Sequence, residues 1–224
     1  DTPDLEIAKQ WIAATEEFVS VYKLGLEFFL TFGQSGVKAI QSESDADIFL
    51  DLKLHDIPHT VAGSARAVAT LAPRFLTVHA SGGHSMINEA VQALPKTDVT
   101  AVTILTSLSE EDLFEIGFSS PALESAVALA RMSTEAGAKA IVCSPLEIQA
   151  IRAVVGLAVH IITPGVRPLS ELGGDDQKRT MTPRAAIDAG ASFVVIGRPI
   201  TQAWRDGRQA MRDRAEAIAD EILN

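Results

Sequence analysis

Short runs of apolar, mostly β-branched residues alternate along this chain with longer stretches whose apolar residues recur at helical spacing. The short runs predict strands at Val19–Leu24, Asp47–Lys53, Phe75–His79, Val99–Leu105, Ala140–Ser144, Ala158–Thr163 and Phe193–Gly197. The longer stretches predict helices at Leu5–Glu17, Thr60–Leu71, Ser85–Leu94, Ala122–Ala136, Pro145–Val154, Pro183–Ala189 and Ile200–Leu223. Such an alternation is typical of a parallel sheet that is covered by helices.

The number of predicted strands falls one short of a closed α/β barrel of the TIM type, (β/α)8. The chain opens with Asp1-Thr2-Pro3-Asp4 and passes at once into a helical pattern, so Asp1 is placed like the first residue after a strand. We therefore expect a (β/α)8 barrel whose first strand lies in residues that precede Asp1. A seven-stranded open sheet is the alternative. No linker or repeat divides residues 1–224, which predicts one domain.

Composition narrows the possible functions. The 224 residues include 47% hydrophobic and 21% charged residues, and 19 basic against 29 acidic side chains give a net charge of −10. This balance argues against a general nucleic-acid or membrane-surface binder. The single cysteine, Cys143, fits a reducing compartment, and no apolar run nears the roughly 20 residues of a membrane span. With no signal peptide at the start of the chain, we expect a cytoplasmic protein.

Charged residues gather at one predicted strand end. Strand periodicity places Phe49, Asp51 and Lys53 on one face, while the leucines between them suit the side that packs on helices. Asp51 and Lys53 then point into the mouth of the barrel, where the polar residues of such folds carry chemistry. A purely structural ion pair at the strand end is the alternative.

The neighbouring strand adds a second lysine to this face. In Val19–Leu24 the residues Val19, Val21 and Lys23 share one side, so Lys23 also points inward. Two lysines would then converge with Asp51 and Asp56. Opposite charges that alternate in a partly desolvated site hold one another ionised and form a preorganised electrostatic environment.

Two features of the C-terminal part predict an anion site. Gly197-Arg198 follows an apolar strand and begins a helix, so backbone N–H groups, the helix N-terminus and the guanidinium could bind phosphate together. The long loop from Thr163 to Arg179 contains glycines and basic residues, which suits a lid over an anion. A surface loop without function is the alternative for this segment.

The remaining chemistry-bearing residues give weaker signals. His79 shares a face with Phe75 and either lines the mouth or has a structural role, whereas His55 is expected to face away from Lys53. The five histidines and one cysteine show no zinc-ligand spacing, so we expect no metal. The chain also lacks the glycine-rich nucleotide motifs and the nucleophile elbow of hydrolases.

The motif Asp51-x-Lys53-x-x-Asp56-Ile57-Pro58-x-Thr60, preceded by Tyr22-Lys23-Leu24-Gly25, closely resembles the orotidine 5′-monophosphate decarboxylase family. The similarity extends through Leu105-Thr106-Ser107, Gly165-Val166-Arg167-Pro168, Asp176-Gln177-Lys178-Arg179 and Gly197-Arg198-Pro199. The resemblance implies an enzyme that makes UMP in pyrimidine biosynthesis without a cofactor. It also implies a homodimer.

The resemblance implies roles for individual residues. The catalytic network would be Lys23, Asp51, Lys53 and Asp56, with Asp56, Ile57 and Thr60 reaching the active site of the partner subunit. The substrate-binding positions implied are Asp1 for the ribose hydroxyls, Thr106 for the pyrimidine, and Arg167, Gln177, Gly197 and Arg198 for the phosphate and the closing loop.

The implied mechanism suits these residue types. Loss of CO2 from C6 of orotate leaves a carbanion, which Lys53 could stabilise as an ammonium and then protonate. A sugar-phosphate decarboxylase or aldolase-like synthase, which would use Mg²⁺ on an enediolate, is the alternative on a similar barrel. A non-catalytic phosphate-ligand sensor is the alternative outside enzymes, although it would need no set of two lysines and two aspartates.

Overall fold

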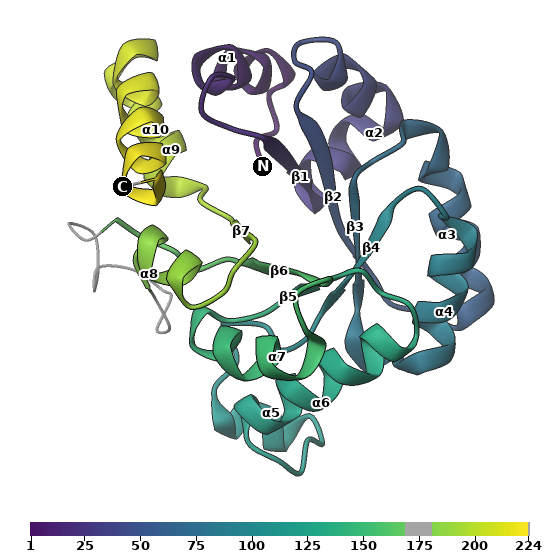
Figure 1. Ribbon diagram of the computed structural model, residues 1–224. Helices are drawn as coiled ribbons and strands as arrows, with labels where there is room; N and C mark the ends of the chain where they lie inside the picture. The colour runs from purple at the N-terminus through teal and green to yellow at the C-terminus, as the bar shows by residue number, and fades with distance from the viewer. Residues whose placement is uncertain (169–180, 224) are drawn as a thin grey trace.

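The computed structural model describes residues 1–168 and 181–223. These residues form one sheet of seven parallel strands, in which each strand pairs with the next along the chain. The strands are β1 (Val21–Gly25), β2 (Asp47–Leu54), β3 (Phe75–His79), β4 (Asp98–Val102), β5 (Ala140–Val142), β6 (His160–Thr163) and β7 (Phe193–Val194). The sheet curls as a barrel does, with the helices on its outside (Figure 1).

Helices connect the strands and cover the outer face. The α-helices are α1 (Leu5–Thr15), α2 (Leu26–Gln41), α3 (Pro58–Val68), α4 (Gly83–Ala93), α5 (Glu110–Glu115), α6 (Ala122–Glu135), α7 (Ile148–Val155), α8 (Pro183–Asp188), α9 (Arg198–Thr201) and α10 (Arg208–Leu223). Short 3-10 segments lie at Ala69–Leu71, Ala80–Gly82, Pro145–Glu147 and Gln202–Asp206. The predicted α/β class and the TIM-type arrangement are therefore confirmed, with β1 and β7 as the edges of the described sheet.

Two hydrophobic clusters follow from the alternation of side chains along the strands. Phe49, Phe75, Ala140 and Ile162 are buried together on the inner face of the curled sheet. The residues between them face the helices, as Leu50 and its neighbours do in the larger cluster. This alternation places the residues that share parity with Phe49 and Phe75 inside the barrel.

A cation packs against aromatic rings near the starts of the strands. The guanidinium of Arg74 lies 5.1 Å from the ring centroid of Phe75 and 5.0 Å from that of Phe193. It also donates to Oδ2 of Asp47 over 2.6 Å. We expect these contacts to contribute to stability, because catalytic groups in such a barrel gather at the opposite, carboxyl ends of the strands.

The edge strands β1 and β7 face each other across a gap, which we call the seam (Figure 1). Helices α1 and α10 pack against one another beside it. Arg212 of α10 donates to both carboxylate oxygens of Glu17, over 2.9 and 2.6 Å, and its guanidinium lies 5.0 Å from the ring centroid of Phe18. The first and last helices therefore join the two edges of the described sheet.

Several predicted boundaries were wrong. The segment Leu26–Gln41, which carried no predicted helix, forms α2 with a kink at Gly33, whose φ is 59°. The strand predicted at Phe193–Gly197 ends at Val194, and that predicted at Val99–Leu105 runs from Asp98 to Val102. The long helix predicted at Ile200–Leu223 is interrupted at Gly207, whose φ of 104° ends the preceding 3-10 segment.

Candidate active site

Lys23, Asp51 and Lys53 meet at the carboxyl ends of β1 and β2. Nζ of Lys23 lies 3.0 Å from Oδ2 of Asp51, and Nζ of Lys53 lies 2.8 Å from Oδ1. Each lysine thus holds a different oxygen of one carboxylate. The pairing of β1 with β2 produces this arrangement, because the parallel register sets Lys23 beside Phe49 and Gly25 beside Asp51.

Burial and the neighbouring positive charges have opposite effects on the pKa of Asp51. Its side chain is 12% exposed, and desolvation is the largest single influence on its pKa, raising it. The charges and hydrogen bonds of Lys23 and Lys53 together outweigh burial, so the pKa of Asp51 lies below its ordinary value. The carboxylate is therefore ionised at neutral pH.

The backbone around Lys53 departs from a regular strand. Lys53 has a φ of 47°, in the left-handed region that non-glycine residues seldom occupy. Its N–H donates over 2.8 Å to the hydroxyl of Thr77 on β3. The same hydroxyl donates to Oδ1 of Asp51 over 3.0 Å. The sequence pattern had singled out Asp51 and Lys53, but nothing in it indicated a role for Thr77.

Asp56 lies outside this cluster within its own chain. Its carboxylate accepts the N–H of Ile57 over 2.6 Å, in the loop between β2 and α3. In the described part of the chain, no hydrogen bond or ion pair connects Asp56 with Lys23, Asp51 or Lys53. Ile57 is 66% exposed, and Thr60 is exposed in the first turn of α3. The three residues that the resemblance assigned to a partner subunit therefore face outward.

Asp1 lies at the N-terminus of α2. Its Oδ1 accepts the N–H of Phe28 over 3.4 Å. The carboxylate packs so closely on Gly25 that a side chain at that position would collide with it. A carboxylate near a helix N-terminus is favoured by the unpaired N–H groups there.

Two of the remaining residues predicted to bind the substrate follow the ends of strands. Thr106 is partly exposed in a turn after β4, and Gly197 precedes the first residue of α9. Arg198 begins α9 and is exposed. Arg167 is buried at 6% exposure, and its N–H donates to the carbonyl of Met181 over 3.0 Å. Gln177 and most of the predicted lid lie outside the described residues.

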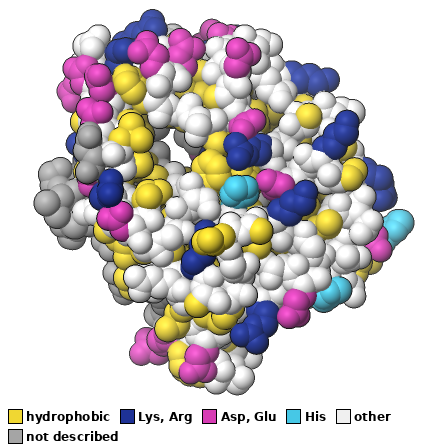
Figure 2. Space-filling model, viewed as in Figure 1, with side chains coloured by type: hydrophobic (Ala, Val, Ile, Leu, Met, Phe, Trp, Pro, Cys, Tyr) yellow, Lys and Arg dark blue, Asp and Glu magenta, His cyan; other side chains and the backbone are white. Residues whose placement is uncertain are grey.

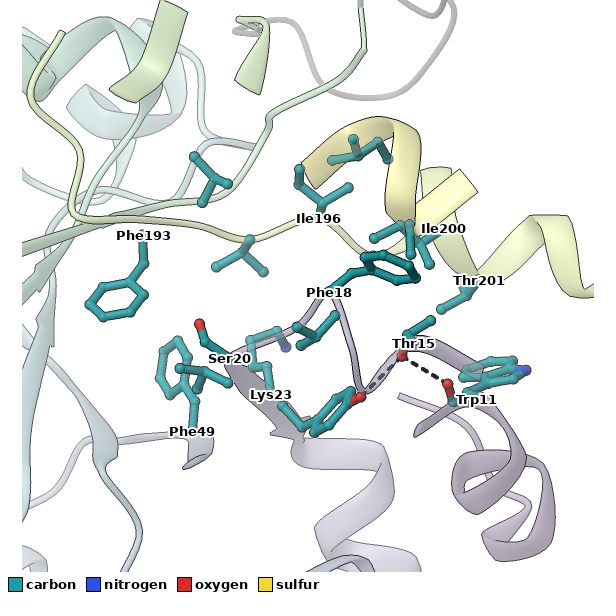
Figure 3. Close-up of a pocket in the computed structure, with 18 of the residues that line it drawn as sticks. Trp11, Thr15, Phe18, Ser20, Lys23, Phe49, Phe193, Ile196, Ile200 and Thr201 are labelled. Carbon is teal, nitrogen blue, oxygen red and sulfur yellow. Dashed lines mark hydrogen bonds between the residues drawn. The ribbon is translucent and has the colours of Figure 1, made fainter. Parts of the chain in front are cut away.

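A cavity of about 480 Å³ occupies the seam and is lined mainly by apolar side chains. Figure 3 shows Phe49 and Phe193 at one end of it and Phe18 and Ile200 at the other. Lys23 also lines it, and Figure 2 shows an opening on the side where the sheet edges face each other. Asp1 and Gly197 lie on its wall too, whereas Asp51 and Lys53 are not among its described lining residues. The charged cluster therefore lies at the margin of the cavity.

Two histidines flank the charged cluster. The rings of His55 and His79 are 5.5 Å apart between centroids. Burial, assisted by the nearby His55 and Lys53, lowers the pKa of His79 below its ordinary value. Within the described ranges, no group of three or more His, Cys, Asp or Glu side chains could hold a metal, and no helix is long and apolar enough to cross a membrane.

Comparisons with known proteins agree on one family. The model of the Orotidine 5'-phosphate decarboxylase / HUMPS family matches residues 1–213. The orotidine 5'-phosphate decarboxylase of Thermobifida fusca is 52% identical over 216 residues, covering 96% of this chain and 92% of that protein. The one from Frankia casuarinae is 44% identical, covering 91% and 80%.

Solved structures show the same likeness. A crystal structure of orotidine 5'-phosphate decarboxylase from Lactobacillus acidophilus is 36% identical with a TM-score of 0.78, covering 90% of this chain and 86% of the other. The fold of the enzyme of that name from Pyrococcus horikoshii matches with a TM-score of 0.80 at 22% identity, covering 100% and 97%.

Proposed function

The chain belongs to the Orotidine 5'-phosphate decarboxylase / HUMPS family, and we propose on this premise that it decarboxylates orotidine 5′-monophosphate to UMP in pyrimidine biosynthesis. The observation that carries the proposal is the set of two ammonium groups on one buried carboxylate, at 3.0 and 2.8 Å. We further propose that residues 1–224 act as one barrel domain in the cytoplasm.

The reaction requires stabilisation of charge at a carbon atom. When CO2 leaves C6 of the pyrimidine, the bonding electrons remain on C6 as a carbanion. The ammonium of Lys53, fixed by Asp51, would stabilise that charge and then deliver its proton to C6 to complete UMP. A cation fixed before the reaction incurs little reorganisation at the transition state, and no cofactor is needed for this step.

Asp51 would have two effects. It fixes both lysines, because each of its oxygens accepts one of them. Its negative charge would also repel the carboxylate of the substrate and thereby favour departure of CO2. Lys23, which lines the cavity, would contact the substrate next to the reacting centre.

The phosphate would be bound away from C6. Gly197 and Arg198 at the start of α9, Arg167 and Gln177 form the proposed phosphate and lid positions, with Asp1 at the ribose and Thr106 at the pyrimidine. The position of Gly197 and Arg198 after the last described strand supports this assignment, since phosphate sites recur there in such barrels. Binding energy at the phosphate would help to assemble the reacting groups.

Asp56, Ile57 and Thr60 would complete the site of a second subunit. Their outward position in one chain supports a homodimer with shared sites, because the exposed Ile57 side chain gains burial at an interface. The carboxylate of Asp56 would then add a second negative charge beside the partner's lysines.

Incubation with orotidine 5′-monophosphate tests the proposal directly. Conversion to UMP changes the ultraviolet absorbance of the pyrimidine, and release of CO2 gives an independent measure. We expect both signals in equal amounts. Failure to convert this substrate, together with Mg²⁺-dependent turnover of a sugar phosphate, would instead assign the chain to the other branch of the family.

A further inference from the structure

The strand β2 carries a local irregularity at the charged cluster. Leu50 pairs with Leu76 and Leu54 pairs with Val78, so β2 advances four residues while β3 advances two. Lys53 lies within this bulge with its φ of 47°. Bulges of this kind redirect side chains and leave backbone groups without their usual partner in the ladder.

Thr77 lies opposite this bulge, on the inner face of β3. Its side chain is completely buried, and it shares parity with Phe75, which belongs to the interior cluster. The hydroxyl accepts the N–H of Lys53 over 2.8 Å, which gives the displaced amide a partner. A buried amide left without an acceptor would be costly.

The same hydroxyl also fixes the carboxylate. It donates to Oδ1 of Asp51 over 3.0 Å, the oxygen that also accepts Nζ of Lys53 over 2.8 Å. One oxygen atom of Thr77 thus links the backbone of Lys53 to the group that holds its ammonium. Its single proton is directed at Asp51 and its lone pair at the amide, so the two contacts are satisfied together.

We propose that Thr77 is a positioning residue for the decarboxylation, which rests on the proposed function. Its hydroxyl holds the left-handed backbone at Lys53 and orients the carboxylate of Asp51, so that the ammonium of Lys53 is aimed at C6. Thr77 acts through these two residues. Its effect therefore falls on the chemical step more than on binding of the nucleotide.

Thr77→Val and Thr77→Ser distinguish the effect of the hydroxyl on catalysis from the effect of the shape of the side chain. Valine keeps the volume and removes both hydrogen bonds, whereas serine restores the hydroxyl. Misplacement of a catalytic group by about 1 Å can lower a rate by about 100-fold. We expect Thr77→Val to lower kcat by about 10- to 100-fold with KM within about threefold of wild type, and Thr77→Ser to remain within about fivefold in kcat.

Thr100→Val is the matched control. Thr100 is equally buried, pairs with Thr77 across β3 and β4, and donates its hydroxyl to the carbonyl of Asp98 over 2.9 Å. Loss of its hydroxyl therefore removes a buried hydrogen bond without touching the charged cluster. We expect Thr100→Val to lower the melting temperature about as much as Thr77→Val while its kcat stays within about twofold of wild type.

The outcomes distinguish the positioning role of Thr77 from the proposed decarboxylation. If wild type converts orotidine 5′-monophosphate and Thr77→Val keeps kcat within about twofold, the positioning inference is wrong. Equal losses of kcat in Thr77→Val and Thr100→Val would also overturn it, because the effect would then be one of general stability. A wild type that leaves the substrate unchanged would overturn the proposed function and this inference with it.

Discussion

Nζ of Lys53 lies 2.8 Å from Oδ1 of Asp51, although only one residue separates the two along β2. Alternate residues of a strand share a face, so the motif Asp-x-Lys sets its two charges on one side, although the left-handed backbone at Lys53 and its bond to Thr77 also shape the contact. Lys23 reaches the second oxygen from β1 over 3.0 Å. The central ion pair is thus built into β2, and pairing with β1 completes it.

Replacement of Asp51 by asparagine should reduce the dependence of stability on acid pH. The pKa of Asp51 is lowered in the folded protein, so its ionisation contributes stability that is fully present above the unfolded carboxyl pKa of about 3.9. That contribution is lost as the pH falls through the lower pKa of the folded state. Urea unfolding of wild type and Asp51→Asn between pH 7 and pH 3 measures the difference.

In that experiment, the stability advantage of wild type over Asp51→Asn should be largest at neutral pH and should narrow below about pH 4. Asp188→Asn is a suitable control, because among the described residues the carboxylate of Asp188 forms a surface ion pair with Arg184 on the same helix, far from the charged cluster in the sequence. A constant gap between wild type and Asp51→Asn over the whole range would contradict the assigned ionisation.

Arg198→Ala should weaken use of the phosphorylated substrate. Loss of a charge-assisted contact to phosphate is expected to cost about 2–3 kcal/mol in kcat/KM. The nucleoside orotidine, which lacks the phosphate, should be nearly indifferent to the substitution. Steady-state kinetics with both substrates provide the comparison. Equal losses for both would remove Arg198 from the phosphate site.

Decarboxylation should continue unchanged in excess EDTA. The proposed step uses the ammonium of Lys53 where a sugar-phosphate enzyme of the alternative class would use Mg²⁺ to stabilise an enediolate. Initial rates before and after chelation and dialysis test this. Activity that disappears with the chelator and returns only with Mg²⁺ would contradict the proposed mechanism.

Mixed dimers test whether Asp56 acts in the partner's site. Lys53→Ala and Asp56→Ala should each be inactive alone, yet a mixture that exchanges subunits should regain activity. In a mixed dimer one site carries both substitutions and the other carries neither. Random exchange of equal amounts gives about half mixed dimers, so recovery should approach roughly a quarter of wild-type activity.

Lys23→Ala mixed with Lys53→Ala is the matched control. Lys23 and Lys53 are joined through Asp51 of their own chain, so every site of that mixture lacks one lysine. No activity should return. If subunit exchange is demonstrated and neither mixture recovers, Asp56 acts in the site of its own chain.

The strand pattern predicted most of the fold, because strands of a parallel sheet that is buried on both faces consist of short, nearly continuous apolar runs. The strand predicted at Phe75–His79 agrees with β3 at both ends. The helix α2 was missed although Glu27, Thr31 and Lys38 recur at helical spacing, and Gly33, whose φ of 59° lies outside the helical region, interrupts the pattern. The break before α10 depends on Gly207, and a lone glycine inside a helical pattern is often tolerated.

In the candidate site, too, the residues that could be predicted are those whose position depends on a single strand. Asp51, Lys53 and Lys23 could be placed inward from the alternation within single strands. Thr77 could not, because its contacts depend on the shift in register between β2 and β3, which involves two strands at once. Asp56 follows the strand and was expected to converge with these charges, whereas within its own chain its carboxylate accepts the adjacent amide of Ile57.

The most direct measurement compares wild type with Lys53→Ala on orotidine 5′-monophosphate, following absorbance and CO2 release, with binding of UMP measured separately. Lys53 is proposed to stabilise and protonate the C6 carbanion, so its loss should lower kcat by at least about 1,000-fold, or about 4 kcal/mol. Binding of UMP, which carries no developing charge at C6, should change by less than about tenfold. A Lys53→Ala variant that keeps kcat within about tenfold of an active wild type would contradict the proposed role of Lys53 in stabilising and protonating the carbanion.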